Sequence, residues 1–132
     1  MIIYSAVRAS HRAILLNERI YSMKIRFDKI EAADMPQFLG GEGALIAKIH
    51  KDEKNKILRG TLEPGSSIGL HCHKTSSETI FILSGKGSVL CDGVIEPLEA
   101  GDCHYCPQGH EHSLRCDSEE QLEFVAVVPE HN

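Results

Sequence analysis

Short apolar segments separated by turn residues fill the chain from Met23 onward, and within them apolar and polar side chains tend to alternate. A period of two places successive side chains on opposite faces of a β-strand. Nine or ten such segments follow one another at spacings of about 8–12 residues, with almost no helical periodicity after residue 35. The pattern predicts an all-β sandwich or closed barrel.

Turn residues mark where the strands end. Pro64 and Gly65 occupy the positions that a type II turn prefers. Asp92 and Gly93 form a two-residue hairpin signal. Residues 31–36, which end in a proline, are expected to form another turn.

The order of strands and turns also indicates pairing. We expect residues 44–50 to pair with 57–62 across a charged hairpin loop, and residues 112–115 to pair with 121–128 as the closing pair. The expected strands cover residues 23–30, where the alternation is weak, and 44–50, 57–62, 67–73, 78–83, 88–91, 94–96, 103–106, 112–115 and 121–128.

Two of these strands, 67–73 and 78–83, carry apolar residues on both faces. Strands of this kind are covered on both faces. In a barrel this small, we expect the outer cover to be a second subunit, which predicts a homodimer.

Residues 1–22 differ from the rest and are expected to form an N-terminal extension, helical or disordered. Ser10 is a suitable cap for a short helix through Glu18. The extension is then an arm that docks on the barrel or a second subunit; the alternatives are a frayed tail or a true start at Met23. Residues 23–132 are expected to form a single domain.

Composition narrows the partners. The 132 residues include 14 Lys and Arg against 19 Asp and Glu, for a formal net charge of −5. No basic run stands out, so we expect neither nucleic acid nor a membrane surface as a partner. No apolar run is long enough to span a bilayer, and five cysteines without a secretory signal favour reduced thiols in the cytoplasm.

The chemistry is concentrated in two stretches. His71 and His73 are two residues apart on an expected strand, so both imidazoles project from the same face. Glu78 follows after a four-residue loop and is close enough to add an oxygen ligand. Two imidazoles and a carboxylate suit one divalent ion of Zn, Mn, Fe, Ni or Co.

The spacing of these residues resembles the two motifs of the cupin superfamily. Gly65-x5-His71-x-His73-x4-Glu78-x6-Gly85 matches the first motif, and Gly101-x5-Pro107-x-Gly109-x2-His112 matches the second after fifteen residues, a gap typical of compact bacterial single-domain cupins. The resemblance implies a jelly-roll barrel, a double-stranded β-helix, with one metal ion held by His71, His73, Glu78 and His112. It also implies open coordination positions. Cys116 replaces the asparagine that usually ends the second motif, which is not a metal ligand in the pattern.

Other polar residues near the motifs have weaker patterns. His110 and Glu111 are candidates for contact with a substrate. Only one of His104 and Tyr105 can face the barrel, because neighbours on a strand point to opposite faces.

The cysteines are expected to serve packing. Cys103 and Cys106 lie on opposite faces of a strand, where they cannot chelate or bridge, and are expected to be buried thiols. Cys72 is expected to face away from the metal, in the core or an interface.

The resemblance supports a metal-dependent enzyme acting on a small polar metabolite. An iron centre suits dioxygenase-like chemistry, whereas zinc or manganese suits isomerase-like or lyase-like chemistry, which also needs a general base. The alternative is a non-catalytic module that binds or senses a small molecule or metal. A metal-free structural protein is the weakest interpretation. No motif chooses a substrate.

Overall fold

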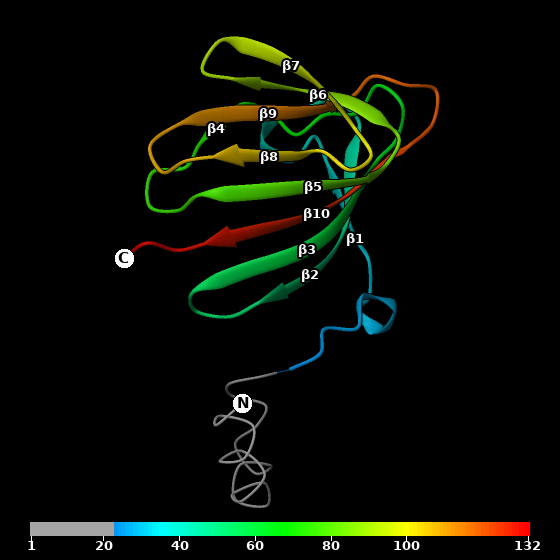
Figure 1. Cartoon of the computed structure of the whole chain (residues 1–132). Helices are drawn as coiled ribbons and strands as arrows, with labels where there is room; N and C mark the ends of the chain where they lie inside the picture. Colours follow the sequence, from blue (N-terminus) through cyan, green and yellow to red (C-terminus); the bar gives the residue numbers. More distant parts are fainter. Residues whose placement is uncertain (1–22) are drawn as a thin grey trace, which may run out of the picture.

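Two antiparallel β-sheets face each other in the computed structural model, which describes residues 23–132 (Figure 1). One sheet has six strands in the order β1-β2-β3-β10-β5-β8, and the other has four in the order β4-β9-β6-β7. From β7 to β10 successive strands alternate between the sheets, and the predicted all-β jelly-roll barrel is confirmed. The strands are β1 (Ala33–Pro36), β2 (Ala44–Lys51), β3 (Asn55–Leu62), β4 (His71–Cys72), β5 (Glu78–Ser84), β6 (Lys86–Cys91), β7 (Val94–Glu99), β8 (Cys103–Cys106), β9 (Glu111–Cys116) and β10 (Leu122–Pro129); the 3-10 helices are η1 (Phe27–Lys29) and η2 (Phe38–Gly40).

The core lies between the sheets and follows strand alternation. Its buried members come from the inner faces of both sheets: Leu45, Ala47, Leu58, Leu62, Ile68, Ile80, Ile82, Val89, Leu98, Leu114, Cys116, Leu122, Phe124 and Ala126. Phe124 is fully buried, and its ring fills the space beside Gly60. A Cβ at Gly60 would lie 2.4 Å from this ring, so packing explains the glycine in the middle of β3.

Three predicted local features are confirmed. The backbone N–H of Ser66 donates to the carbonyl of Glu63 over 2.9 Å, with Gly65 at φ +79°, as a type II turn requires. Asp92 and Gly93, both at positive φ, join β6 to β7. Strands β2 and β3 pair from Leu45↔Leu62 to Lys51↔Lys56.

The segment before β2 differs from its prediction. Residues 23–30 do not form a strand; η1 lies there, and Arg26 forms a 2.9 Å ion pair with Asp28. Residues 31–36 were expected to turn but include β1, which pairs with β2. Pro36 is tolerated because β1 is an edge strand and Pro36 is its last residue.

The predicted closing pair is also wrong. Strand β9 pairs with β4 and β6 in the small sheet, whereas β10 lies between β3 and β5 in the large sheet. The chain crosses between sheets after Cys116. The expected strand at residues 67–73 is reduced to β4, because the backbone N–H groups of Ser67 and Gly69 donate to carbonyls of the segment before β2, at Glu42 and Phe38.

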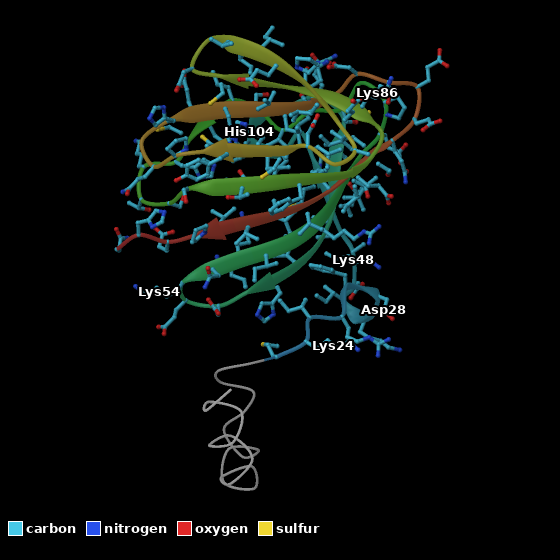
Figure 2. All side chains as sticks on the ribbon, in the orientation of Figure 1. Lys24, Asp28, Lys48, Lys54, Lys86 and His104 are labelled. Carbon is cyan, nitrogen blue, oxygen red and sulfur yellow. The ribbon has the colours of Figure 1, made fainter. Side chains whose placement is uncertain are left out.

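The turns β2–β3, β4–β5, β6–β7 and β8–β9 gather at one end of the barrel, on the left of Figure 1. Lys54 marks this end and Lys86 the other (Figure 2). Among residues 23–132 no helix is long and apolar enough to cross a membrane. The predicted arm at residues 1–22 lies outside the described residues.

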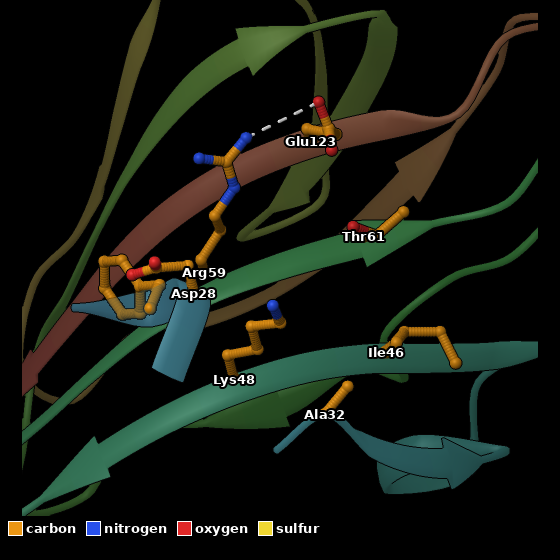
Figure 3. A pocket seen from close by; sticks show the side chains of 8 residues that line it. Asp28, Ala32, Ile46, Lys48, Arg59, Thr61 and Glu123 are labelled. Carbon is orange, nitrogen blue, oxygen red and sulfur yellow. Dashed lines mark ion pairs between the residues drawn. The ribbon is translucent and has the colours of Figure 1, made fainter. Parts of the chain in front are cut away.

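A pocket of about 320 Å³ lies against the outer face of the large sheet, beside η1 (Figure 3). Lys48 and Arg59 line it together with Asp28 and Glu123, and Arg59 lies 3.7 Å from Glu123. Its charges are therefore balanced locally. It is separated from the barrel interior by the sheet itself.

Candidate metal centre

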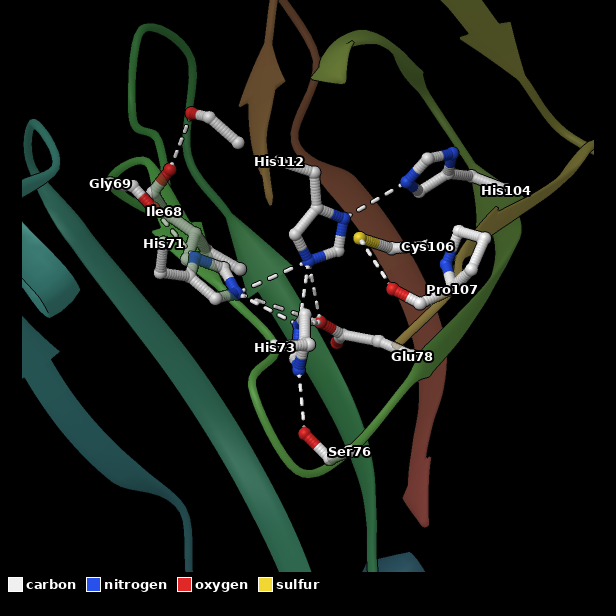
Figure 4. Close-up of polar contacts among 11 residues, drawn as sticks. Ile68, Gly69, His71, His73, Ser76, Glu78, His104, Cys106, Pro107 and His112 are labelled. Atoms are coloured by element: carbon white, nitrogen blue, oxygen red, sulfur yellow. Dashed lines mark hydrogen bonds and ion pairs between the residues drawn. The ribbon is translucent and has the colours of Figure 1, made fainter. Parts of the chain in front are cut away.

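Three imidazoles and one carboxylate converge inside the barrel (Figure 4). They lie toward the end of the barrel where the β4–β5 and β8–β9 turns meet. The Nε2 atoms of His71, His73 and His112 lie 2.9–3.2 Å from one another. Oε1 of Glu78 lies 3.1 Å from Nε2 of His73, 2.9 Å from that of His112 and 3.8 Å from that of His71. The structure thus brings together all four residues that the motifs indicate.

Strand register explains the convergence. His71 on β4 is the direct partner of His112 on β9, so their side chains share one face. His73 follows β4, and its backbone N–H and C=O bond to the turn before β9. Glu78 opens β5 on the inner face, in line with Ile80 and Ile82. The carboxylate therefore comes from the large sheet and the imidazoles from the side of the small sheet.

The donor atoms fit a metal ion. Their six separations define one point equidistant from all four, and this point lies about 2.0 Å from each, the length of zinc–nitrogen and zinc–oxygen bonds. Each imidazole presents the same atom, Nε2, to that point.

The other ring nitrogen of each imidazole has a hydrogen-bond partner. Nδ1 of His71 donates to the carbonyl of Gly69 over 2.7 Å, and Nδ1 of His73 lies 2.9 Å from the hydroxyl of Ser76. Nδ1 of His112 lies 2.9 Å from Nε2 of His104. Such partners fix the tautomer that leaves Nε2 free to bind a metal.

The electrostatics keep the carboxylate ionised. Burial alone would raise the pKa of Glu78, but hydrogen bonds from His112 and His73, together with the nearby imidazole of His71, outweigh burial and hold the pKa well below its usual range. Burial lowers the pKa of His71, yet the nearby carboxylate of Glu78 and the hydrogen bond to Gly69 outweigh burial, so the net pKa is raised.

The pKa of His104 shifts in the opposite direction to that of His71. Burial, together with the charge of His112, lowers the pKa of His104. A neutral His104 accepts the Nδ1 proton of His112 at its Nε2. The two residues lie on β8 and β9, which belong to different sheets, so this hydrogen bond spans the seam between the sheets.

A small cavity of about 80 Å³ adjoins the cluster. Its walls are mostly apolar, and Lys56 is the one charged residue lining it apart from Glu78. The lining comprises Phe38, Leu39, Leu45, Lys56, Leu58, Ile68, His71, His73, Glu78, Phe124 and Val128.

The structure places His110 and Glu111 away from the cluster. His110 is exposed and its Nδ1 bonds to the carboxylate of Asp92 in the β6–β7 turn. Glu111 is exposed and precedes His112 on β9, so it points to the opposite face. Neither lines the cavity beside the ligands.

Sequence reasoning assigned no role at the site to three residues near the ligands. Ser76 and His104 hold ligand imidazoles, and Lys56 lines the cavity. Alternation with the apolar Leu58 could have placed Lys56 on the inner face. For His104 the sequence left two choices, and its register opposite Ile80 on β5 settles which residue faces inward.

The cysteines are five free thiols. Cys106 is buried but Cys103 is exposed, so the prediction of two buried thiols is wrong for Cys103, although the two do lie on opposite faces. Cys72 faces away from the cluster and is exposed, not part of the core. Cys116 is buried and donates its S–H to the carbonyl of Glu120 over 3.2 Å, which ties the β9–β10 loop.

Comparisons with known families, sequences and solved structures agree with one another. The family described as Cupin domain matches residues 58–128, which include all four clustered residues. An oxalate-binding protein of Thermotoga maritima is 33% identical over 112 residues, which cover 80% of this chain and 93% of the relative. The crystal structure of a predicted oxalate decarboxylase from Thermotoga maritima matches with a TM-score of 0.78 and 31% identity, over 82% of this chain and 99% of that one. A Cupin 2 conserved barrel domain protein from Salinispora arenicola shares the fold, with a TM-score of 0.65 and 24% identity over 83% and 90% of the two chains.

Proposed function

The chain belongs to the cupin family, and on that premise we propose that it holds one divalent metal ion in the cluster and binds a small carboxylate there. The observation that carries the proposal is the geometry of four donor atoms around one point about 2.0 Å from each. The ion is Zn, Mn, Fe, Ni or Co, because imidazole and carboxylate ligands suit all five. When bound, it supplies a Lewis-acidic centre with positions open to ligand oxygens.

The cavity limits the size of the group that can lie beside the four clustered residues. A volume of about 80 Å³ suits a small group such as one carboxylate of a ligand. A small carboxylate also agrees with the relative described as an oxalate-binding protein.

Binding has more support in the cavity than acid–base turnover. Isomerase-like chemistry needs a general base in reach of the substrate. Apart from the four clustered residues, Lys56 is the one titratable side chain among the described residues that line the cavity. We therefore propose binding as the function, and reactions that rely on the ion itself, such as dioxygenase-like ones, as the second candidate.

Metal analysis of untagged protein, purified without added metal, tests the proposal. We expect close to one divalent ion per chain in the wild type and almost none in His73→Ala. Calorimetric titration of the loaded protein with oxalate should then show saturable binding. Negligible metal in the wild type, or binding of oxalate that does not depend on metal, would refute the proposal, and product analysis of the same mixture reports turnover.

We also propose that residues 23–132 act as a single domain in a cytoplasmic homodimer. Five free thiols support a reducing compartment. The outward side chains Phe81 and Leu83 of β5 and Tyr105 of β8 are 47%, 43% and 58% exposed on the outer face of the large sheet, a surface suited to a second copy. Light scattering of the wild type and of Phe81→Glu would test the dimer.

A further inference from the structure

Lys51 and Lys56 stand opposite each other at the mouth of the barrel, and we propose that together they form a second anion-binding site beside the metal. The inference rests on the proposed function and narrows its ligand class to short dianions, with oxalate as the smallest dicarboxylate. One end of such a ligand meets the metal, and the remaining negative charge meets the lysines.

Strand register places the two lysines side by side. Lys51 and Lys56 are the last pair of the β2–β3 ladder before the connecting turn. Lys51 continues the inward series of Leu45 and Ala47 on β2, and Lys56 continues that of Leu58 on β3. Directly opposed residues have Cβ atoms about 5 Å apart. Both ammonium groups therefore extend from the inner face at the same level.

Such a pair is unfavourable unless an anion joins it. Like charges directly opposite each other destabilise a sheet. Within residues 23–132, neither lysine takes part in an ion pair, although the mouth pocket they border, of about 260 Å³, also contains Asp52, Glu53 and Glu130.

Two of these acids already have partners. The carboxylate of Asp52 accepts the backbone N–H groups of Lys54 and Asn55 within its own turn, at 2.9 and 2.7 Å. The carboxylate of Glu130 accepts the hydroxyl of Thr75. Their hydrogen bonds hold Asp52 and Glu130 in the turn and the loop. Glu53 is exposed and forms no ion pair with either lysine, so the two lysines remain available to a ligand.

The lysine pair adjoins the metal cavity. Lys56 lines both the cavity and the mouth pocket, and His73 and Val128 are shared by the two spaces in the same way. A ligand on the metal therefore has its outer end beside Lys56. The rest of the cavity wall is apolar apart from the clustered residues, so Lys56 is the one lysine or arginine among residues 23–132 that lines the cavity.

Calorimetric titrations with oxalate and glycolate test the inference. Both are two-carbon metal chelators, but oxalate carries two negative charges and glycolate one. The proteins are the metal-loaded wild type, Lys51→Gln, Lys56→Gln and the control Lys48→Gln. Lys48 lies on β2 too but on the outer face, so its substitution removes the same charge. Metal content and thermal stability are measured for every protein.

Lys56→Gln should weaken oxalate binding about tenfold and glycolate binding much less, because hydrogen bonds between charged groups are the stronger ones. Lys51→Gln should act in the same direction, and Lys48→Gln should leave both affinities unchanged. Neither Lys51→Gln nor Lys56→Gln should lose metal or thermal stability, since each substitution removes the repulsion between two like charges. The inference is overturned if the affinities for oxalate and glycolate fall equally, or if Lys51→Gln and Lys56→Gln bind both acids as Lys48→Gln does. Wild type that is loaded with metal but binds neither acid overturns the proposed function itself.

Discussion

Replacing His104 by leucine should weaken metal binding about 10- to 100-fold while leaving the fold intact. His112 is 1% exposed, and the partner of its Nδ1 is Nε2 of His104, 2.9 Å away. A metal on Nε2 of His112 fixes the proton on Nδ1. In His104→Leu this buried N–H loses its acceptor.

The size of the effect follows from that lost acceptor. An unsatisfied buried donor costs about 1–3 kcal/mol, and about 1.4 kcal/mol corresponds to a tenfold change in affinity. Without metal, His112 is free to carry its proton on Nε2 and donate it to Glu78, 2.9 Å away. The cost therefore falls mainly on the metal-bound protein and appears as weaker binding.

Competition with a chromophoric zinc chelator measures the affinity, and thermal unfolding in EDTA measures the metal-free fold. His104→Gln, which keeps an acceptor, should recover part of the affinity. His50→Leu is the matched control, because it removes a half-buried strand imidazole from the outer face of β2. Zinc affinity of His104→Leu within twofold of the wild type would refute this reasoning, as would equal losses in His104→Leu and His50→Leu.

Four further substitutions have expected outcomes. His73→Ala should purify with almost no metal yet retain its unfolding temperature in EDTA, checked by elemental analysis and circular dichroism. Gly60→Ala should destabilise the protein by about 1–3 kcal/mol in urea unfolding, because its Cβ would lie 2.4 Å from the ring of Phe124. Cys116→Ala should cost about 1–2 kcal/mol in the same assay through a small cavity and a lost loop hydrogen bond. His110→Ala should change metal affinity less than about twofold, because an exposed ion pair contributes little.

The fold was largely predictable wherever local chemistry decides the structure. Alternation and turn residues place most strands, and the turn at Gly65 depends on a conformation that glycine readily adopts. The predictions fail where the neighbouring strand, rather than the local sequence, decides the structure. Residues 33–36 become a strand because the edge of β2 is available to them, and β10 joins β3 and β5 because it fits between them rather than beside β9.

The candidate site divides in the same way. Even spacing puts His71 and His73 on one face, and the motif spacing indicates Glu78 and His112. The sequence could not show whether His104 or Tyr105 faces the barrel interior, because both occupy one short strand. Only the pairing of β8 with β5 shows that His104 is the inward residue. Residues that act across the seam between two sheets leave no periodic signal along the chain.

The origin of the ligands links metal binding to the stability of the barrel. Glu78 belongs to the large sheet and His112 to the small one, and His104 bonds to His112 across the seam between β8 and β9. These two strands have no ladder with each other and are connected by the turn at residues 107–110, so the hydrogen bond between His104 and His112 adds a side-chain link between the two sheets. An ion that binds only the folded protein stabilises it in proportion to the logarithm of its concentration over Kd. An ion held by Glu78 and His112 would join the two sheets, so hydrogen exchange in β8 and β9 should slow on metal binding more than exchange in β2, which lies far from the seam in the sheet order.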